Sequence, residues 1–171
     1  MTTTRRRSPA SHSRIASPSD ADYLAVMSRA VFQAGLSWAA IDRQWEQLVA
    51  AFGGFAPPTV GAYGDRDVGR IMAHPGILHS ERKILATIHN AQALLAVAQE
   101  HGSVRRYLRS LGGFDDVVAD LKRRFSHVGD ISAYYFLFRC GEQVPPFSRW
   151  IKTVKGDHPR IREMVQADRQ R

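Results

Sequence analysis

The chain turns at Val31-Phe32-Gln33-Ala34-Gly35-Leu36-Ser37-Trp38, a segment that joins two stretches with the apolar spacing of amphipathic helices. A plain helix–helix turn needs a Gly and a few polar residues, but this one adds two aromatic residues, an amide and Leu36. Two interpretations fit these residue types. The loop is a buried turn whose Phe32 and Trp38 fill the core, or it presents an aromatic surface to a flat partner such as a nucleobase.

Composition indicates a soluble globular protein. Of the 171 residues, 44% are hydrophobic and 23% charged, which are ordinary values for one domain with a substantial core. No apolar run approaches the roughly 20 residues that span a bilayer, and the N-terminus has no secretory signal. The single cysteine, Cys140, excludes an internal disulfide and a multi-cysteine metal site. We therefore expect a cytoplasmic protein without membrane contact.

The net charge of +8 is concentrated at the two ends of the chain. Residues 1–18 hold four Arg and no acid, residues 149–171 hold seven basic and three acidic residues, and the middle is balanced. We expect a disordered basic tail over 1–18, a folded domain over 19–150 and a basic helix or tail over 151–171. Basic tails favour a polyanionic partner, although they also serve solubility.

Apolar periodicity and capping residues predict an all-α fold of about eight helices in one compact domain. The longest helix begins at Ser80 with Glu81 and ends before Gly102. Pro57-Pro58 is expected to keep the connection after the helix 37–52 extended. The predicted helices cover residues 20–31, 37–52, 59–63, 65–73, 80–100, 103–111, 115–125 and 130–141, and a charged terminal helix is expected after residue 157.

A second candidate site is the hairpin Phe125-Ser126-His127-Val128-Gly129, which follows the basic run Lys122-Arg123-Arg124. The first N–H groups of a helix have no intrahelical partner, so a hairpin that ends in Gly before a helix can bind phosphate through its backbone. Asp130 is the predicted N-cap of that helix. The alternative is an ordinary Gly turn beside a solvated basic face.

Other chemistry has little support. No two of the seven His residues have helical i, i+4 spacing and no carboxylate cluster is present, so we expect neither a metal nor another cofactor. Ser37 has no evident His and Asp partners, and Cys140 falls in an apolar helix, where a thiol usually packs.

Several segments, in the same order, resemble the 3-methyladenine DNA glycosylase I family of the helix-hairpin-helix glycosylase superfamily. Residues 32–38 resemble its signature loop, and Gly76-Ile77-Leu78-His79-Ser80-Glu81-Arg82-Lys83-Ile84 resembles its Gly-Ile-Ile-Arg-x-x-x-Lys-Ile segment. Further matches are Asn90-Ala91, Glu100-His101-Gly102-Ser103 and the hairpin 125–129.

The resemblance, which spans residues 20–145, implies a helix-hairpin-helix fold and base-excision repair of alkylated purines such as 3-methyladenine. The partner is then double-stranded DNA with an alkylated base, bound by a nucleoid-associated monomer that flips the base out of the duplex. The family assigns the base pocket to Phe32, Gln33 and Trp38 and the wedge loop to Ala34, Gly35 and Leu36. It assigns phosphate contacts to Lys83, Lys122, Arg123, Arg124, His127, Val128, Gly129 and Asp130.

The chain also departs from the family. The pocket Glu, eight residues before the loop Trp, corresponds to Ala30, and the family's zinc ligands and N-terminal Tyr-His-Asp-x-Glu-Trp-Gly block are missing. The superfamily's catalytic Asp corresponds to the region Val144-Pro145-Pro146, which has no carboxylate. The catalytic residue is therefore unknown. Asp22, Asp42 and Glu46 lie on helices beside the loop and are either substitutes or surface carboxylates.

Two functional hypotheses remain. The chain is an N-glycosylase for cationic alkylated purines, whose weak glycosidic bonds need little acid–base help, or a non-catalytic relative that recognises damaged or distorted duplex. A lyase activity is not expected, since no Lys follows the hairpin before Lys152. The sequence leaves open whether Tyr23 or Tyr134 replaces the missing pocket tyrosine.

Overall fold

The structure is a computed structural model that describes residues 13–77, 79–154, 161–162 and 165–166. The described residues form nine α-helices and two 3-10 helices, and none of them is a strand, which confirms the predicted all-α class. In chain order these are α1 (Asp20–Gln33), α2 (Trp38–Ala51), η1 (Gly53–Phe55), α3 (Pro57–Gly61), α4 (Asp65–Met72), α5 (Glu81–His101), α6 (Val104–Ser110), α7 (Phe114–Arg124), α8 (Asp130–Arg139), α9 (Phe147–Trp150) and η2 (Ile151–Thr153).

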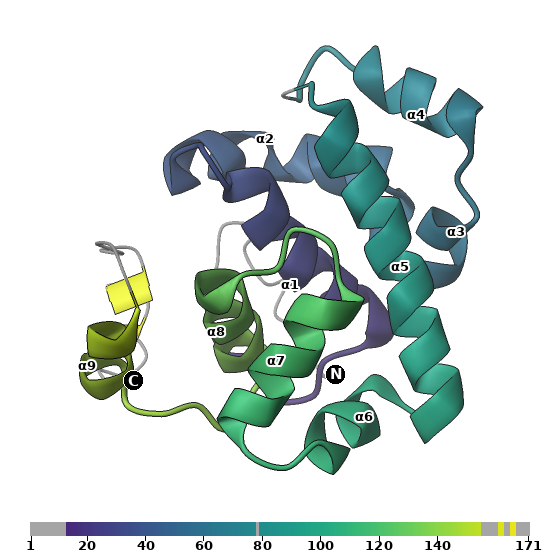
Figure 1. The fold of residues 1–171 in the computed structure, drawn as a ribbon. Helices are drawn as coiled ribbons and strands as arrows, with labels where there is room; N and C mark the ends of the chain where they lie inside the picture. Colours follow the sequence, from purple (N-terminus) through teal and green to yellow (C-terminus); the bar gives the residue numbers. More distant parts are fainter. Residues whose placement is uncertain (1–12, 78, 155–160, 163–164, 167–171) are drawn as a thin grey trace, which may run out of the picture.

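The longest helix, α5, packs against α1, α3, α4 and α6 (Figure 1). It begins after Ser80, whose hydroxyl accepts the Lys83 N–H, and it ends at Gly102 in the left-handed region, with φ of 85°. Its buried face contains Ile84, Thr87, Ile88, Ala91 and Leu94. Leu95 is 37% exposed, because it lies about 100° around the helix from the buried Leu94.

α1 contacts α2, α5 and α8. A capping box fixes its start, since the Ser19 hydroxyl accepts the Asp22 N–H at 3.1 Å and the Asp22 carboxylate accepts the Ser19 N–H at 2.9 Å. Its apolar face is buried, with Tyr23, Leu24, Met27 and Val31 all at most 2% exposed. These contacts fix the orientation of the loop that follows α1.

The Pro57-Pro58 pair starts a helix. Both prolines occupy the first turn of α3, where a missing N–H costs nothing and the fixed φ already suits a helix. The expected extended connection is therefore wrong at this point. At Pro145-Pro146 the chain differs, because Pro146 has non-helical dihedrals (φ −53°, ψ 129°) and α9 begins only at Phe147.

Residues 13–15 of the N-terminal segment pack against α8. The Ile15 N–H donates to the Arg139 carbonyl at 2.7 Å, the Arg139 Nε donates to the Ser13 carbonyl at 2.8 Å, and Ile15 is only 6% exposed. A Cβ on Gly141 would lie only 2.8 Å from the carbonyl oxygen of Ile15, so this close approach requires a glycine. The predicted disorder of residues 1–18 is therefore wrong for 13–18, and residues 1–12 lie outside the described part.

The C-terminal segment also packs against the domain. The Trp150 ring stacks on Tyr134 at 4.1 Å between centroids. Residues 161–162 and 165–166 are helical, and Ile161 and Val165 belong to the core. The predicted terminal helix is described only at these four positions. No helix in the described part of the chain is long and apolar enough to cross a membrane.

Candidate nucleic-acid interface

The loop between α1 and α2 is a tight, protruding turn. The Leu36 N–H donates to the Gln33 carbonyl at 2.8 Å, and the Gln33 side chain donates back to the Leu36 carbonyl at 3.1 Å. Gly35 has φ of 81° and no atom within 4 Å of the place of a Cβ, so its left-handed conformation faces open space. Ala34 and Gly35 are exposed and Leu36 is half-buried. The predicted wedge residues therefore form the tip of the turn.

Lys83 joins this loop to α5. Its ammonium donates to the Phe32 carbonyl at 2.9 Å and the Ala34 carbonyl at 2.6 Å, which are among the last carbonyls of α1 and attract a cation. Burial lowers the pKa of Lys83. Lys83, which was predicted as a phosphate contact, thus binds the backbone carbonyls of the loop itself.

Asn90 holds the hairpin between α7 and α8 from the same helix. Its amide donates to the Ser126 carbonyl at 3.1 Å and its oxygen accepts the Ser126 N–H at 2.7 Å. The Ser126 hydroxyl also lies 2.9 Å from Nδ1 of His89. His127 then has φ of 59°, which is uncommon outside glycine. These contacts fix the backbone that leads into α8.

The hairpin ends at an open helix N-terminus. Gly129, and not the predicted Asp130, is the N-cap, and no side chain caps the first N–H groups of α8. His127 and Gly129 are exposed, and Val128 is half-buried. Burial, followed by the nearby charges of Arg82 and Lys83, lowers the pKa of His127. The loop, the first turns of α5 and the hairpin therefore lie together on one face, with the hairpin arching towards α1 and α5 (Figure 1).

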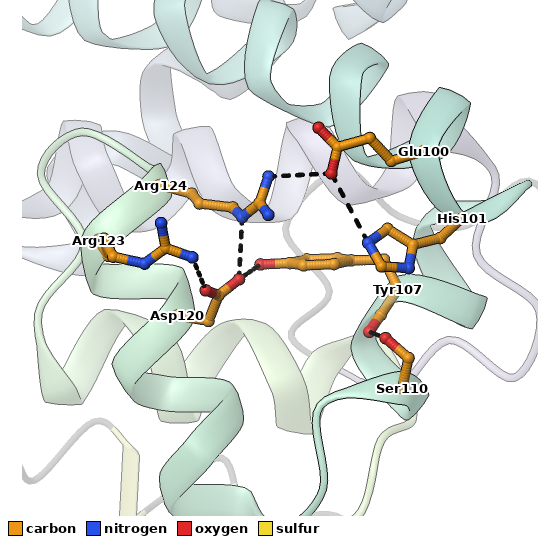
Figure 2. Close-up of polar contacts among 7 residues, drawn as sticks. All are labelled: Glu100, His101, Tyr107, Ser110, Asp120, Arg123 and Arg124. Carbon is orange, nitrogen blue, oxygen red and sulfur yellow. Dashed lines mark hydrogen bonds and ion pairs between the residues drawn. The ribbon is translucent and has the colours of Figure 1, made fainter.

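The basic run that precedes the hairpin is paired within the protein. Lys122 contacts Asp130 at 2.9 Å. Arg123 and Arg124 both contact Asp120, and Arg124 also reaches Glu100 at 3.2 Å, as Figure 2 shows.

The Asp120 carboxylate also accepts a hydrogen bond from the Tyr107 hydroxyl at 2.7 Å. Burial opposes the ionised form of Asp120, but the hydrogen bonds from Tyr107 and Arg123 prevail and lower its pKa. Lys122 and Arg124 therefore join α7 to α8 and α5, while Arg123 pairs within α7. The positive charge that these three side chains could offer a phosphate is largely offset.

The aromatic residues of the loop differ in their surroundings. The Phe32 ring is 2% exposed and packs edge-on against Phe52 at 5.7 Å, as the buried-turn interpretation expects. Trp38 lies in the first turn of α2, is 7% exposed and packs against Tyr135 at 4.7 Å between centroids. Of the predicted pocket residues, Phe32 thus belongs to the core, Trp38 packs on Tyr135, and Gln33 closes the turn itself.

The tyrosine beside Trp38 is neither Tyr23 nor Tyr134. It is Tyr135, which is 1% exposed; burial raises its pKa, and its hydroxyl accepts a hydrogen bond from Arg139 at 2.7 Å. The Tyr134 hydroxyl points the other way, to the Pro145 carbonyl at 2.9 Å. Tyr23 is buried in the core at 2% exposure.

An ion pair that was not predicted from the sequence crosses between α1 and α2. The Arg29 guanidinium bonds the Asp42 carboxylate and lies 4.8 Å from the centre of the Trp45 ring. Arg29 is 2% exposed and directly precedes Ala30, the position of the missing Glu. The sequence feature that could have indicated this pair is Arg29, the one charged residue in the run Tyr23–Phe32.

The other carboxylates lie elsewhere. Asp22 caps the opposite end of α1, and Glu46 is exposed on α2. Glu142, the carboxylate closest in sequence to the position of the superfamily's catalytic Asp, contacts Arg109 of α6 at 3.2 Å. Among the described residues, no group of three or more His, Cys, Asp or Glu side chains is placed to hold a metal.

Comparison with known proteins fits this geometry. The Methyladenine glycosylase family model matches residues 16–128. DNA-3-methyladenine glycosylase 1 of Escherichia coli K12 is 30% identical over an alignment of 130 residues, and the match covers 64% of this chain and 70% of that protein.

Two solved structures of 3-methyladenine DNA glycosylase I have the same fold. One has a TM-score of 0.66 at 27% identity and covers 76% of this chain and 82% of its own. The other, from Staphylococcus aureus and concerned with 3-methyladenine recognition, has a TM-score of 0.66 at 25% identity and covers 76% and 79%. The chain belongs to the methyladenine glycosylase family.

Proposed function

We propose that this protein is a monofunctional DNA glycosylase that flips alkylated purines out of duplex DNA and releases them. One observation carries the proposal: Lys83 and Asn90, two turns apart on α5, bind the α1–α2 loop and the hairpin respectively. A base-flipping protein needs a filler for the duplex, an aromatic pocket and backbone anchors for the strand. Here a single helix holds the filler and the anchor in register.

Each element has a role in this proposal. Leu36 enters the space that the flipped base leaves, and Trp38 stacks on the base. The open N–H groups at the start of α8 bind a phosphate of the lesion strand. Water then replaces the base at C1′ of the sugar and loses one proton to the solvent, while the base leaves with the electrons of the C1′–N bond. A cationic purine leaves as a neutral molecule, so the reaction needs little acid.

The second candidate is a non-catalytic relative that binds damaged duplex. The observation that favours it is Ala30, which is 4% exposed and provides no carboxylate where the family has its Glu. Such a protein would keep the loop, the hairpin and the lesion preference, but it would not shorten the lifetime of the glycosidic bond.

Base release distinguishes the two. DNA treated with a methylating agent is incubated with the full-length protein, and released bases and abasic sites are quantified. Release of 3-methyladenine or 7-methylguanine above the spontaneous rate supports the glycosylase. Tight binding to the same DNA without any release supports the non-catalytic relative and rejects the first proposal.

A further inference from the structure

We infer that Arg82 and His127 bind one phosphate of the lesion strand together, beside the open N-terminus of α8. The inference rests on the proposed function and names a strand contact for it. Arg82 lies in the first turn of α5, and His127 lies in the hairpin between α7 and α8. Arg82 was not among the residues predicted from the sequence to contact phosphate.

The first step is the position of Arg82 on α5. His89 follows Arg82 by seven residues, which is about two helical turns, so both side chains lie on the same face of the helix. That face meets the hairpin, since Nδ1 of His89 lies 2.9 Å from the Ser126 hydroxyl. On the adjoining face, Lys83 bonds the carbonyls of the α1–α2 loop. Arg82 therefore lies on α5 between the loop and the hairpin.

The second step is the charge around the hairpin. Burial lowers the pKa of His127, and the nearby charge of Arg82, followed by that of Lys83, lowers it further. A guanidinium acts on an imidazole only over a short distance, because water and salt screen longer interactions. Lys122 and Asp130, which flank the hairpin, bond each other and contribute little net charge. Arg82 and His127 thus lie close together, although they come from elements distant in sequence.

The third step is that no acid offsets the charge of Arg82 within the described part of the chain. Its side chain is exposed and forms no ion pair with any described residue. Leu85 and Ala86, three and four residues further along the helix, are apolar, so neither can pair with it. The run Lys122-Arg123-Arg124, by contrast, is bonded to carboxylates throughout. Arg82 is therefore the arginine beside the hairpin whose charge is available to an anion.

The fourth step is the effect of a phosphate on this arrangement. A cation in the first turn of a helix opposes the helix dipole, which favours anions there. Arg82 and a protonated His127 also repel each other. A phosphate between them reverses both effects. It accepts hydrogen bonds from the guanidinium, from the imidazole and from the first N–H groups of α8, which no side chain caps.

The test measures the affinity of the full-length protein for undamaged and methylated duplex over a range of salt concentrations. Arg82→Gln should weaken binding to both duplexes equally, because a phosphate contact carries no information about the base. The loss should be roughly 5- to 30-fold, the value expected for an exposed hydrogen bond to a charged group. The slope of log affinity against log salt should fall by about 0.9.

Arg106→Gln is the matched control. It makes the same charge change at an exposed arginine of α6, the helix that follows the far end of α5. This variant should keep the wild-type salt slope. An equal loss of slope in Arg82→Gln and Arg106→Gln would reduce the effect to net charge and overturn the inference, and so would an unchanged slope in Arg82→Gln.

A double-mutant cycle tests whether the two side chains share one phosphate. Arg82→Gln, His127→Asn and the double variant are compared at about pH 6, where a phosphate keeps the ring protonated. Groups that bind the same phosphate are coupled, so the loss of affinity in the double variant should be smaller than the product of the two single losses. A loss equal to that product or larger means separate phosphates and overturns the inference.

The proximity of the two groups is measured without DNA. In an NMR titration of the free protein, the pKa of His127 should rise in Arg82→Gln, because a nearby positive charge is removed. It should not change in Arg106→Gln. The same spectra show whether each variant is folded. An unchanged pKa of His127 in a folded Arg82→Gln variant overturns the inference.

The inference and the proposed function fail in different ways. Base release by wild type, together with an unaltered salt slope in Arg82→Gln, keeps the glycosylase and rejects the phosphate contact. DNA binding that depends on Arg82 without any base release keeps the contact and rejects the glycosylase. A wild-type protein that does not bind DNA overturns both.

Discussion

The side chain of Asn90 brackets the Ser126 peptide, donating to its carbonyl at 3.1 Å and accepting its N–H at 2.7 Å. Asn90 is 1% exposed, so these bonds are shielded from water and fix the hairpin relative to α5. Lys83, two turns earlier, fixes the α1–α2 loop in the same way. The spacing between loop and hairpin is therefore determined by one rigid helix.

Asn90→Ala should loosen the hairpin and weaken binding to damaged and undamaged duplex alike. It leaves both groups of the Ser126 peptide without their partner, at a cost of about 1–3 kcal/mol in the free energy of unfolding for each buried group. Denaturant unfolding and fluorescence anisotropy measure the two effects. Gln92→Ala is the control, because Gln92 bonds Gly61 from an exposed position on the same helix. Equal effects of the two variants on DNA affinity would contradict the assignment.

Gly129→Asp should weaken DNA binding without destabilising the protein. A Cβ at Gly129 meets no atom within 4 Å, and Asp is a favourable N-cap residue, so the fold should be kept or slightly stabilised. The added negative charge repels the phosphate that the α8 N-terminus is proposed to bind. Gly129→Asn provides the same cap without the charge and should retain most of the affinity. Similar affinities for the Asp and Asn variants would show that no phosphate lies there.

DNA binding should strengthen as the pH falls below about 6.5, through His127. In the free protein, burial and then Arg82 and Lys83 lower the pKa of His127 from 6.5, so the ring is neutral at pH 7. A nearby phosphate favours the protonated ring, and binding should take up a proton. His127→Asn, which tolerates the left-handed backbone, should remove this dependence. A pH profile that is unchanged in the variant would contradict the contact.

The lowered pKa of His127 also makes the free energy of unfolding depend on pH. The unfolded chain regains the ordinary pKa of His and takes up a proton first as the pH falls. The free energy of unfolding should therefore decrease below about pH 6.5 in wild type, and less so in His127→Asn. Thermal unfolding between pH 5 and 8, without DNA, measures this difference.

Removal of residues 1–12 should reduce the salt dependence of DNA binding. The deleted segment contains Arg5, Arg6 and Arg7, and the slope of log affinity against log salt should fall by about 0.9 for each phosphate that these arginines neutralise. The deletion must stop before Ser13, because residues 13–15 are bonded to Arg139 of α8. The triple replacement of these arginines by Gln is the control. An unchanged slope would mean that the tail does not bind DNA.

The sequence predicts features that depend on neighbouring residues better than features that join distant ones. Helix class, the start of the longest helix at Ser80 and the two candidate loops follow from local spacing and were predicted. The Arg29–Asp42 pair joins residues 13 apart on two helices, and the Ile15–Arg139 bond joins the ends of the domain. Neither is visible without the fold.

The pairing of the basic run Lys122-Arg123-Arg124 can be predicted from the sequence only in part. Asp120 lies three and four residues before Arg123 and Arg124, the spacing at which helical side chains pair, so this pairing could have been inferred. The Glu100 contact could not, because Glu100 of α5 and Arg124 of α7 are 24 residues apart and meet only in the fold (Figure 2). A run of basic residues therefore indicates a phosphate site only after its nearby acids are considered.

Trp38→Ala should remove lesion preference and retain general DNA affinity, because stacking on the base is abolished while the hairpin contacts remain. Loss of this buried ring also costs about 3–5 kcal/mol in the free energy of unfolding. Trp150→Ala is the matched control, since Trp150 is 6% exposed and stacks on Tyr134 away from the loop. Circular dichroism at the assay temperature should confirm that both variants are folded.

The central claim is that an alkylated base leaves the duplex and is bound beside Trp38. It is tested most directly by the ratio of dissociation constants for undamaged duplex and for a duplex with one 3-deaza-3-methyladenine nucleotide, an alkylated adenine whose glycosidic bond resists cleavage. Base stacking predicts a ratio of roughly 5- to 100-fold in wild type and in Trp150→Ala, and a ratio near one in Trp38→Ala. A wild-type ratio near one, or a ratio that survives in Trp38→Ala, would contradict the claim.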